Sequence, residues 1–132
     1  MASAAKGSDN MPLTIIHAND GEFANRTGQA IFEGDVRGRN MVDASMSKDV
    51  TAAYVFFQPG ARTRMHRHTS DQILLITSGV GMVGDASGDQ QVAVGDCVFI
   101  PANEDHWHGA GDTGLPMAHV TVLTANSETT VL

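Results

Sequence analysis

The sequence predicts an all-β fold, either a sandwich or a barrel, in a single domain. About nine or ten short apolar segments follow one another at roughly 8–12-residue spacing, with turn residues between them. Fourteen glycines favour strands and turns, and no segment has the apolar periodicity of an amphipathic helix. A chain of 132 residues can hold one substantial core. We therefore expect one domain over residues 13–132, after a flexible polar leader over residues 1–12.

The first half of the chain contains one clear strand, residues 50–57. Alternate residues of this strand are apolar on both faces, which predicts that both faces are covered. A jelly roll whose outer sheet meets a second subunit would cover them. Before this strand we expect a short strand at 13–17, turns at 19–28, and an irregular strand at 31–42 that is interrupted by Gly34 and Gly38.

The second half of the chain predicts a series of shorter strands. Ser78-Gly79 and Gly95-Asp96 are turn signals, and residues 84–89 have the composition of a hairpin connection. Cys97 is the single cysteine, so no intramolecular disulfide forms, and its apolar neighbours predict that it is buried. After the strand of His66 and His68, strands are expected at 73–77, 80–83, 90–94, 97–100, 106–109 and 117–124.

Charge and hydropathy argue against several classes of protein. The net charge of −7 is unlike that of a nucleic-acid-binding protein, whose surface is basic. No apolar stretch has the length of a transmembrane helix or the form of a signal peptide, so we expect a cytoplasmic protein without a membrane partner. We expect its ligand to be a small-molecule substrate. Arg62, Arg64 and Arg67 flank a histidine pair. They are either solvated strand residues or an electropositive rim that attracts an anion.

The chemically informative residues are histidines two positions apart. His66 and His68 share one face of a strand, because successive side chains alternate between faces. Two imidazoles on one face provide half of a metal site. The segment 106–108 repeats the His-x-His spacing, and His119 lies in the last expected strand with Thr121 on its face.

Two longer motifs resemble those of the cupin superfamily. The first is Gly60-x5-His66-x-His68-x3-Gln72-x6-Gly79, with Gln72 where most members carry Glu. The second is Gly95-x5-Pro101-x4-His106, with Asn103 where the family usually has Gly. Both motifs lie within residues 50–124, in the family's order and with its internal spacings.

This resemblance implies a jelly-roll β-barrel that forms a homodimer or a higher homo-oligomer and holds one divalent metal per chain. The matching ligands are His66, His68, Gln72 and His106. Three imidazoles and an amide oxygen suit Mn(II), Fe(II), Ni(II) or Zn(II). A neutral Gln72 would leave the metal its full +2 charge and make it a stronger Lewis acid. Alternatively, Gln72 only caps its strand, and water completes a three-histidine site.

The chain further resembles the manganese-dependent, cupin-type (R)-selective hydroxynitrile lyases, which makes manganese the expected metal. The matching residues are Thr63, His66, His68, Gln72, 106–110 and His119, together with 59–63, Ala53 and Val55. In that group, the positions of Thr63, His108 and His119 line the substrate pocket. Leu123 stands where those enzymes carry Gln, and Arg64 where they carry a small residue. By strict alternation Arg64 shares the face of His66, where it would narrow the pocket or favour a carboxylate-bearing ligand.

The resemblance implies a metal-dependent lyase that cleaves a cyanohydrin to an aldehyde and cyanide. His119 or His108 would act as general base, with Thr63 beside them, and Ala53, Val55, Arg64 and Leu123 would line the substrate pocket. Alternatively, His108 only buttresses the metal ligands and His119 only hydrogen-bonds to them. Two other enzyme classes stay open: an Fe(II) dioxygenase of a small dicarbonyl, thiol or aromatic compound, and a non-oxidative isomerase, decarboxylase or cyclase. A ligand-binding module without catalysis is the remaining alternative.

Overall fold

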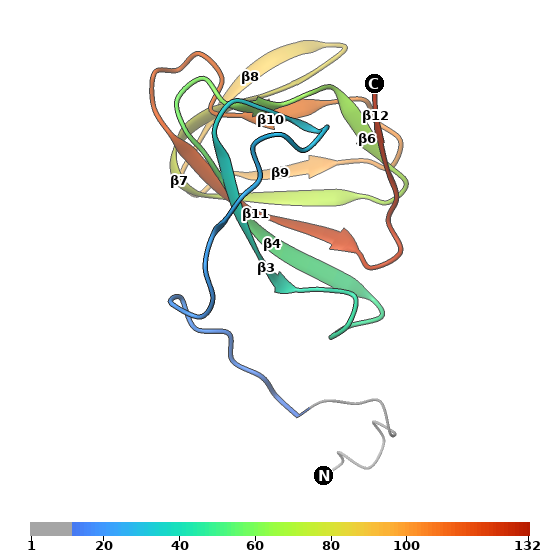
Figure 1. The fold of residues 1–132 in the computed structure, drawn as a ribbon. Coiled ribbons are helices and arrows are strands. Elements are labelled where there is room, and N and C mark those ends of the chain that lie inside the picture. The colour runs from blue at the N-terminus through green and yellow to red at the C-terminus, as the bar shows by residue number, and fades with distance from the viewer. Residues whose placement is uncertain (1–11) are drawn as a thin grey trace.

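The predicted all-β architecture is confirmed by a computed structural model, which describes residues 12–132 and has no helix in that range (Figure 1). Residues 1–11 of the expected leader lie outside the described part of the chain. None of the described residues forms a helix that could cross a membrane. The strands are β1 (Ala24–Asn25), β2 (Phe32–Glu33), β3 (Val36–Val42), β4 (Val50–Phe57), β5 (Arg62–Thr63), β6 (His66–His68), β7 (Gln72–Asp85), β8 (Gly88–Ala93), β9 (Cys97–Ile100), β10 (Trp107–Gly109), β11 (Met117–Thr124) and β12 (Thr129–Val131).

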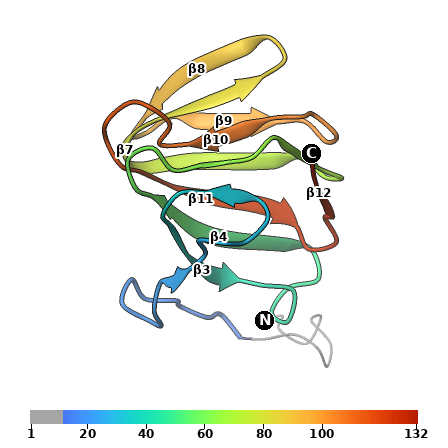
Figure 2. The same cartoon turned by 45° about the horizontal axis from the view of Figure 1, so that its top comes forward.

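Ten of the strands form one antiparallel sheet that curls around the long strand β7 (Figure 2). The main order is β1-β3-β4-β11-β7-β10-β5-β2, and β8 and β9 also pair with β7. The first half of β7 pairs with β9 and β11, whereas its second half pairs with β8 and β10. β7 therefore belongs to both walls of a jelly-roll barrel and joins them. The two remaining strands, β6 and β12, pair with each other.

The turn predicted at Ser78-Gly79 is wrong, because β7 runs through these residues without a break. The chain instead forms a bulge: the register of β7 against β11 shifts between Ala118 and His119. Gly79 has a φ of 73°, and a Cβ there would collide with the backbone carbonyl of Pro116. Glycine is a signal for a bulge as well as for a turn, which explains the misinterpretation.

Three other strand predictions need correction. Residues 13–17 form no strand; Leu13 and Ile15 are 83% and 65% exposed, and no neighbouring strand pairs with them. The irregular strand at 31–42 is two strands, β2 and β3, separated at Gly34, which has a positive φ. The polar tail contains β12, which was not predicted. Strand pairing with β6, and not the local apolar pattern, creates β12.

The interior of the barrel is apolar at one end and rich in histidine at the other. Phe57, Val36 and Met117 are fully buried. The ring of Phe57 packs edge-on against His108, with ring centroids 6.1 Å apart, and lies 5.4 Å from the ring of His119. The apolar core therefore supports the polar site directly.

The outside of the sheet carries a second apolar surface, which we call the outer face. Residues that pair across antiparallel strands lie on the same side of a sheet. Two rows of paired residues run across β4, β11, β7 and β9 on the outer side of this sheet. The outer face consists of Ala52, Tyr54, Ile73, Leu75, Cys97, Phe99, Val120 and Val122. The prediction that Cys97 is buried is wrong for the single chain, because Cys97 lies on the outward side of β9 and is exposed.

Candidate metal centre and cavity

Three histidines from the two motifs meet inside the barrel. His66 and His68 are both buried and share the inner face of β6, as their spacing predicted, whereas Arg67 between them pairs with Asp105 at 3.1 Å. His106 joins them through an isolated bridge: the backbone N–H groups of His66 and His106 each donate to the other's carbonyl oxygen at 2.9 Å. One ring nitrogen from each of the three histidines lies within 4.8 Å of the others.

The outer ring nitrogens of the cluster are fixed by hydrogen bonds. His66 Nδ1 lies 2.7 Å from the carbonyl oxygen of Arg64, and His106 Nδ1 lies 2.8 Å from that of Glu104. A carbonyl oxygen only accepts, so both Nδ1 atoms carry a proton and both Nε2 atoms present a lone pair to the cluster. His68 Nδ1 lies 2.8 Å from the hydroxyl of Thr129 on β12.

All three imidazoles are held neutral. Burial lowers the pKa of His66 to about 3, with the charges of His106 and His68 acting in the same direction. Burial and the charge of His106 lower the pKa of His68 to about 4. Burial also lowers the pKa of His106. Near neutral pH the cluster therefore offers unprotonated ligands, which metal binding requires.

Gln72, the first residue of β7, presents its amide oxygen to the same point. Its Nε2 donates to the hydroxyl of Thr121 at 2.6 Å, which leaves Oε1 facing His106 Nε2 at 3.1 Å. The buried Nε2 atoms of His66 and His68 have no hydrogen-bond partner among the described residues. Unpartnered nitrogen lone pairs next to an amide oxygen fit a divalent metal, and His66, His68, His106 and Gln72 are the residues that could hold it.

A second pair of histidines lies beside this cluster. His119 Nε2 is 3.0 Å from His108 Nδ1, and both rings are buried. Burial lowers the pKa of both, to about 4 for His119 and well below its ordinary value for His108. His108 Nε2 has no hydrogen-bond partner among the described residues. His119 Nδ1 also has no partner there. Two neutral imidazoles carry two protons, and one of these lies in the hydrogen bond between the rings, so either His108 Nε2 or His119 Nδ1 keeps a free lone pair.

Thr63 completes the polar wall. Its hydroxyl oxygen accepts the backbone N–H of His108 at 3.0 Å, and the side chain is 1% exposed. The hydroxyl proton is not used by that hydrogen bond and can be donated into the cavity.

These side chains line a cavity of about 310 Å³. His66, His68 and Gln72 lie on its wall with His108, His119 and Thr63. The wall also includes Ala53, Val55 and Leu123, which are three of the four residues expected to line the substrate pocket. The walls are mostly apolar, which is typical of a site for a small organic molecule.

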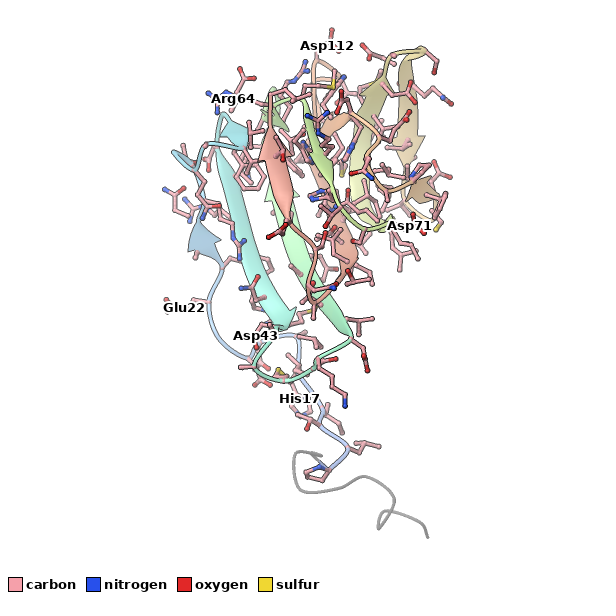
Figure 3. The ribbon with its side chains drawn as sticks, turned by 90° about the vertical axis from the view of Figure 1, so that its right-hand side faces the viewer. His17, Glu22, Asp43, Arg64, Asp71 and Asp112 are labelled. Carbon is pink, nitrogen blue, oxygen red and sulfur yellow. The ribbon has the colours of Figure 1, made fainter. Side chains whose placement is uncertain are left out.

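Arg64 does not line the cavity, contrary to the sequence-based expectation. It is exposed at the outer edge of the molecule (Figure 3), and its guanidinium donates to the carbonyl oxygens of Ala30 and Phe32 at 2.6 and 2.7 Å. The alternation that placed it beside His66 fails because the strand is broken between β5 and β6. Arg62 also lies elsewhere, with its guanidinium 3.7 Å from the ring centroid of Trp107.

Several residues of the site were missed by sequence reasoning. Strand alternation placed Thr121 on the face of His119, but its hydrogen bond to Gln72 becomes visible only in three dimensions. Thr129 lies in a polar tail without a motif, and Arg26 and Asn40, which also line the cavity, lie in segments without a periodic pattern. Asn103 keeps the backbone conformation of the family's glycine, with a φ of 64°. Asn tolerates that conformation better than most residues.

Fold, motif spacing and ligand cluster together define a member of the cupin family, and the chain belongs to it: the family model described as Cupin domain matches residues 53–123. A structural relative with the same barrel is a cupin-like protein from Thermotoga maritima, with a TM-score of 0.78 and 29% identity over 86% of this chain and 88% of that one. The polyketide cyclase RemF from Streptomyces resistomycificus shares the fold, with a TM-score of 0.80 and 14% identity over 92% of this chain and 86% of that one.

Two curated relatives are lyases. The chain is 37% identical to an (R)-mandelonitrile lyase from Granulicella tundricola over 92 residues, which is 69% of this chain and 70% of that protein. It is 30% identical to the dimethylsulfoniopropionate lyase DddW from Ruegeria pomeroyi over 88 residues, which is 65% of this chain. That match spans 58% of the second protein's length.

Proposed function

We propose that this protein is a metal-dependent lyase that cleaves a cyanohydrin into an aldehyde and hydrogen cyanide. The observation that carries the proposal is the hydrogen-bonded His108–His119 pair, which lies on the same cavity wall as the metal-ligand cluster. Likeness to an (R)-mandelonitrile lyase supports the same reaction. We propose manganese as the metal. The cytoplasmic location stays a prediction from the sequence.

The chain's own residues supply the proton transfers. A divalent metal at the cluster supplies Lewis acidity, which lowers the pKa of a hydroxyl group. In the tautomer in which His108 Nδ1 donates to His119 Nε2, His108 accepts the substrate hydroxyl proton at its unpartnered Nε2, and the 3.0 Å hydrogen bond to His119 stabilises the resulting imidazolium. The electrons of the breaking C–C bond leave with cyanide, which takes the proton back from His108 and departs as hydrogen cyanide.

Thr63 and the apolar wall orient the substrate. The Thr63 hydroxyl donates a hydrogen bond to a substrate oxygen, because its proton is not used elsewhere. Ala53, Val55 and Leu123 contact the organic group of the substrate. Cyanide is a stable leaving anion, so one base and one oriented donor suffice.

The test is release of benzaldehyde from mandelonitrile by the Mn(II)-loaded protein. We expect turnover by the wild type and by Arg64→Gln, which alters an exposed side chain outside the cavity. We expect the loss of one ligand in His66→Ala to abolish turnover, and His108→Ala to lower kcat by about 10² to 10⁴. Absence of turnover with every cyanohydrin tried would reject the lyase. Oxygen uptake on loading with Fe(II) would favour the dioxygenase instead.

A further inference from the structure

A guanidinium group lies at the cavity wall, but it belongs to Arg26 and not to Arg64. Arg26 follows β1 and is half-buried. Its backbone N–H donates to Val36 on β3 at 2.7 Å, and its carbonyl oxygen accepts the N–H of Gln29 at 3.1 Å. The segment is therefore anchored to the barrel wall, and Arg26 is held in place by ordered backbone.

Gly38 allows the Arg26 side chain to cross β3. Gly38 pairs with Val55 of β4, and Asn40 pairs with Ala53. Val55 and Ala53 line the cavity, so Gly38 and Asn40 belong to the inner face. A Cβ on Gly38 would overlap the Arg26 guanidinium and Cδ. The absence of a side chain at position 38 opens the path along which Arg26 reaches the cavity.

The Arg26 guanidinium has donors to spare. Nη2 donates to Asn40 Oδ1 at 3.1 Å, the one side-chain hydrogen bond that Arg26 makes within residues 12–132. Neither of the two ion pairs in that part of the chain involves Arg26. A guanidinium carries five N–H donors, so most of them remain for a ligand. Among the described residues that line the cavity, Arg26 is the one basic side chain other than histidine.

One carboxylate, that of Asp43, also borders the cavity. It is exposed, and its Oδ1 is engaged by the backbone N–H of Ser45 at 3.0 Å and by the Ser45 hydroxyl at 2.5 Å. These contacts hold the Asp43 carboxylate on its own loop. No ion pair within residues 12–132 joins a carboxylate to Arg26, so its positive charge can pair with an anion in the cavity.

From these contacts we propose that Arg26, oriented by Asn40, binds a carboxylate on the substrate, at the end of the molecule away from the reacting carbon. The substrate class is then a hydroxy or carbonyl compound with a second, anionic end. This inference names the substrate of the site in the proposed function and rests on that function. Guanidinium and carboxylate groups match as paired donors and acceptors, which gives selectivity as well as affinity.

The experiment compares two aldehydes of nearly equal shape, 4-formylbenzoate and the uncharged 4-formylbenzamide. Their affinities for Zn(II)-loaded protein are measured by ligand-observed NMR titration at low salt. We expect the benzoate to bind about tenfold more tightly, which is the size of a single charge-assisted contact at a partly solvated site. Arg26→Gln should abolish this preference without changing the affinity for the benzamide, which shows that the cavity is intact.

Two further variants sharpen the comparison. Arg64→Gln removes a guanidinium outside the cavity and should leave the preference unchanged, whereas Asp43→Asn should increase it. Equal affinities in the wild type, an undiminished preference in Arg26→Gln, or binding of neither compound would overturn the proposal. No cyanide is present, so the result does not depend on turnover. Cleavage of mandelonitrile without any charge preference would retain the lyase and reject the carboxylate subsite.

Discussion

His66 and His68 show how burial prepares a histidine for metal. Each has one nitrogen in a hydrogen bond to the protein and one buried nitrogen without a partner in the described residues. A buried group of this kind destabilises the apoprotein, because its lone pair has lost water and gained nothing. Binding of a metal to these lone pairs would offset that loss. These residues therefore favour function over the stability of the metal-free barrel.

The same burial predicts how stability depends on pH. The folded-state pKa is about 3 for His66 and about 4 for His68 and His119, below the ordinary value of 6.5. The unfolded chain therefore binds protons first as the pH falls. Stability is complete above about pH 6.5 and is lost as the pH falls from about 6.5 to about 3, by up to about 1.4 kcal/mol per pH unit for each histidine.

Urea denaturation of the chelator-treated protein at pH 7 and pH 5 measures this loss of stability. We expect a lower free energy of unfolding at pH 5, and a smaller difference in His119→Gln, which removes one of the titrating groups. A free energy of unfolding that is the same at both pH values would contradict the prediction.

Arginines show where sequence reasoning about single residues ends. The resemblance to the cupin motifs predicted that His66, His68, Gln72 and His106 would lie together, and the structure brings these four side chains to one point. Arg64 was misplaced, since a two-residue break in the strand is enough to turn a side chain to the other side. No sequence pattern pointed to Arg26, because its place in the cavity depends on Gly38 of β3.

The short strand β12 belongs to the candidate metal site although it carries none of the ligands. It pairs with β6 from Thr129 opposite His68 to Val131 opposite His66. Its threonine hydroxyl is the hydrogen-bond partner of His68 Nδ1. A hydroxyl can donate as well as accept, so His68 is the ligand whose tautomer is least restricted by the protein.

Thr129→Val should weaken metal binding by about 10- to 100-fold, the usual effect of removing a group that orients a metal-ligating histidine. A competition titration with a chromophoric chelator measures the affinity. Thr130→Val is the matched control, because Thr130 lies on the same strand opposite Arg67 and makes no side-chain hydrogen bond to a ligand. Equal affinities in the two variants would show that the Thr129 hydroxyl does not support the site.

Elements with strong local patterns were predictable, and elements that depend on distant partners were not. The strand at 50–57 was predicted with the bounds that β4 has, since apolar residues on both faces mark it. The expected strand at 13–17 has the composition of a strand, but none of the described residues pairs with it. β12 has the opposite character: a polar sequence, and a partner in β6.

At the scale of the molecule, the outer face leaves a large apolar surface on one wall of the barrel. Phe99 is 60% exposed, Leu75 44% and Ile73 39%. Contiguous apolar surface of this kind usually marks an interface. The sequence-based expectation of a homodimer fits it, and we propose that the outer faces of two copies pack together.

Leu75→Lys combined with Phe99→Lys should convert the dimer to a monomer, because each charge would be buried against its counterpart across a two-fold axis. Sedimentation equilibrium measures the mass. Leu115→Lys is the control, since Leu115 is an equally apolar residue that is 50% exposed in the loop before β11. A double variant with the same mass as the wild type would place the interface elsewhere, and a monomeric wild type would reject the homodimer.

The cluster at the centre of this barrel is assembled from distant parts of the chain. The hydrogen bond between His68 and Thr129 joins residues 61 positions apart, and the one from Gln72 to Thr121 joins residues 49 positions apart. Contacts of such high contact order form late, because chain entropy is lost before they add stability. An early, partly folded chain therefore holds no complete ligand set. A bound metal would add its free energy to the finished barrel alone, and would therefore slow unfolding without speeding folding.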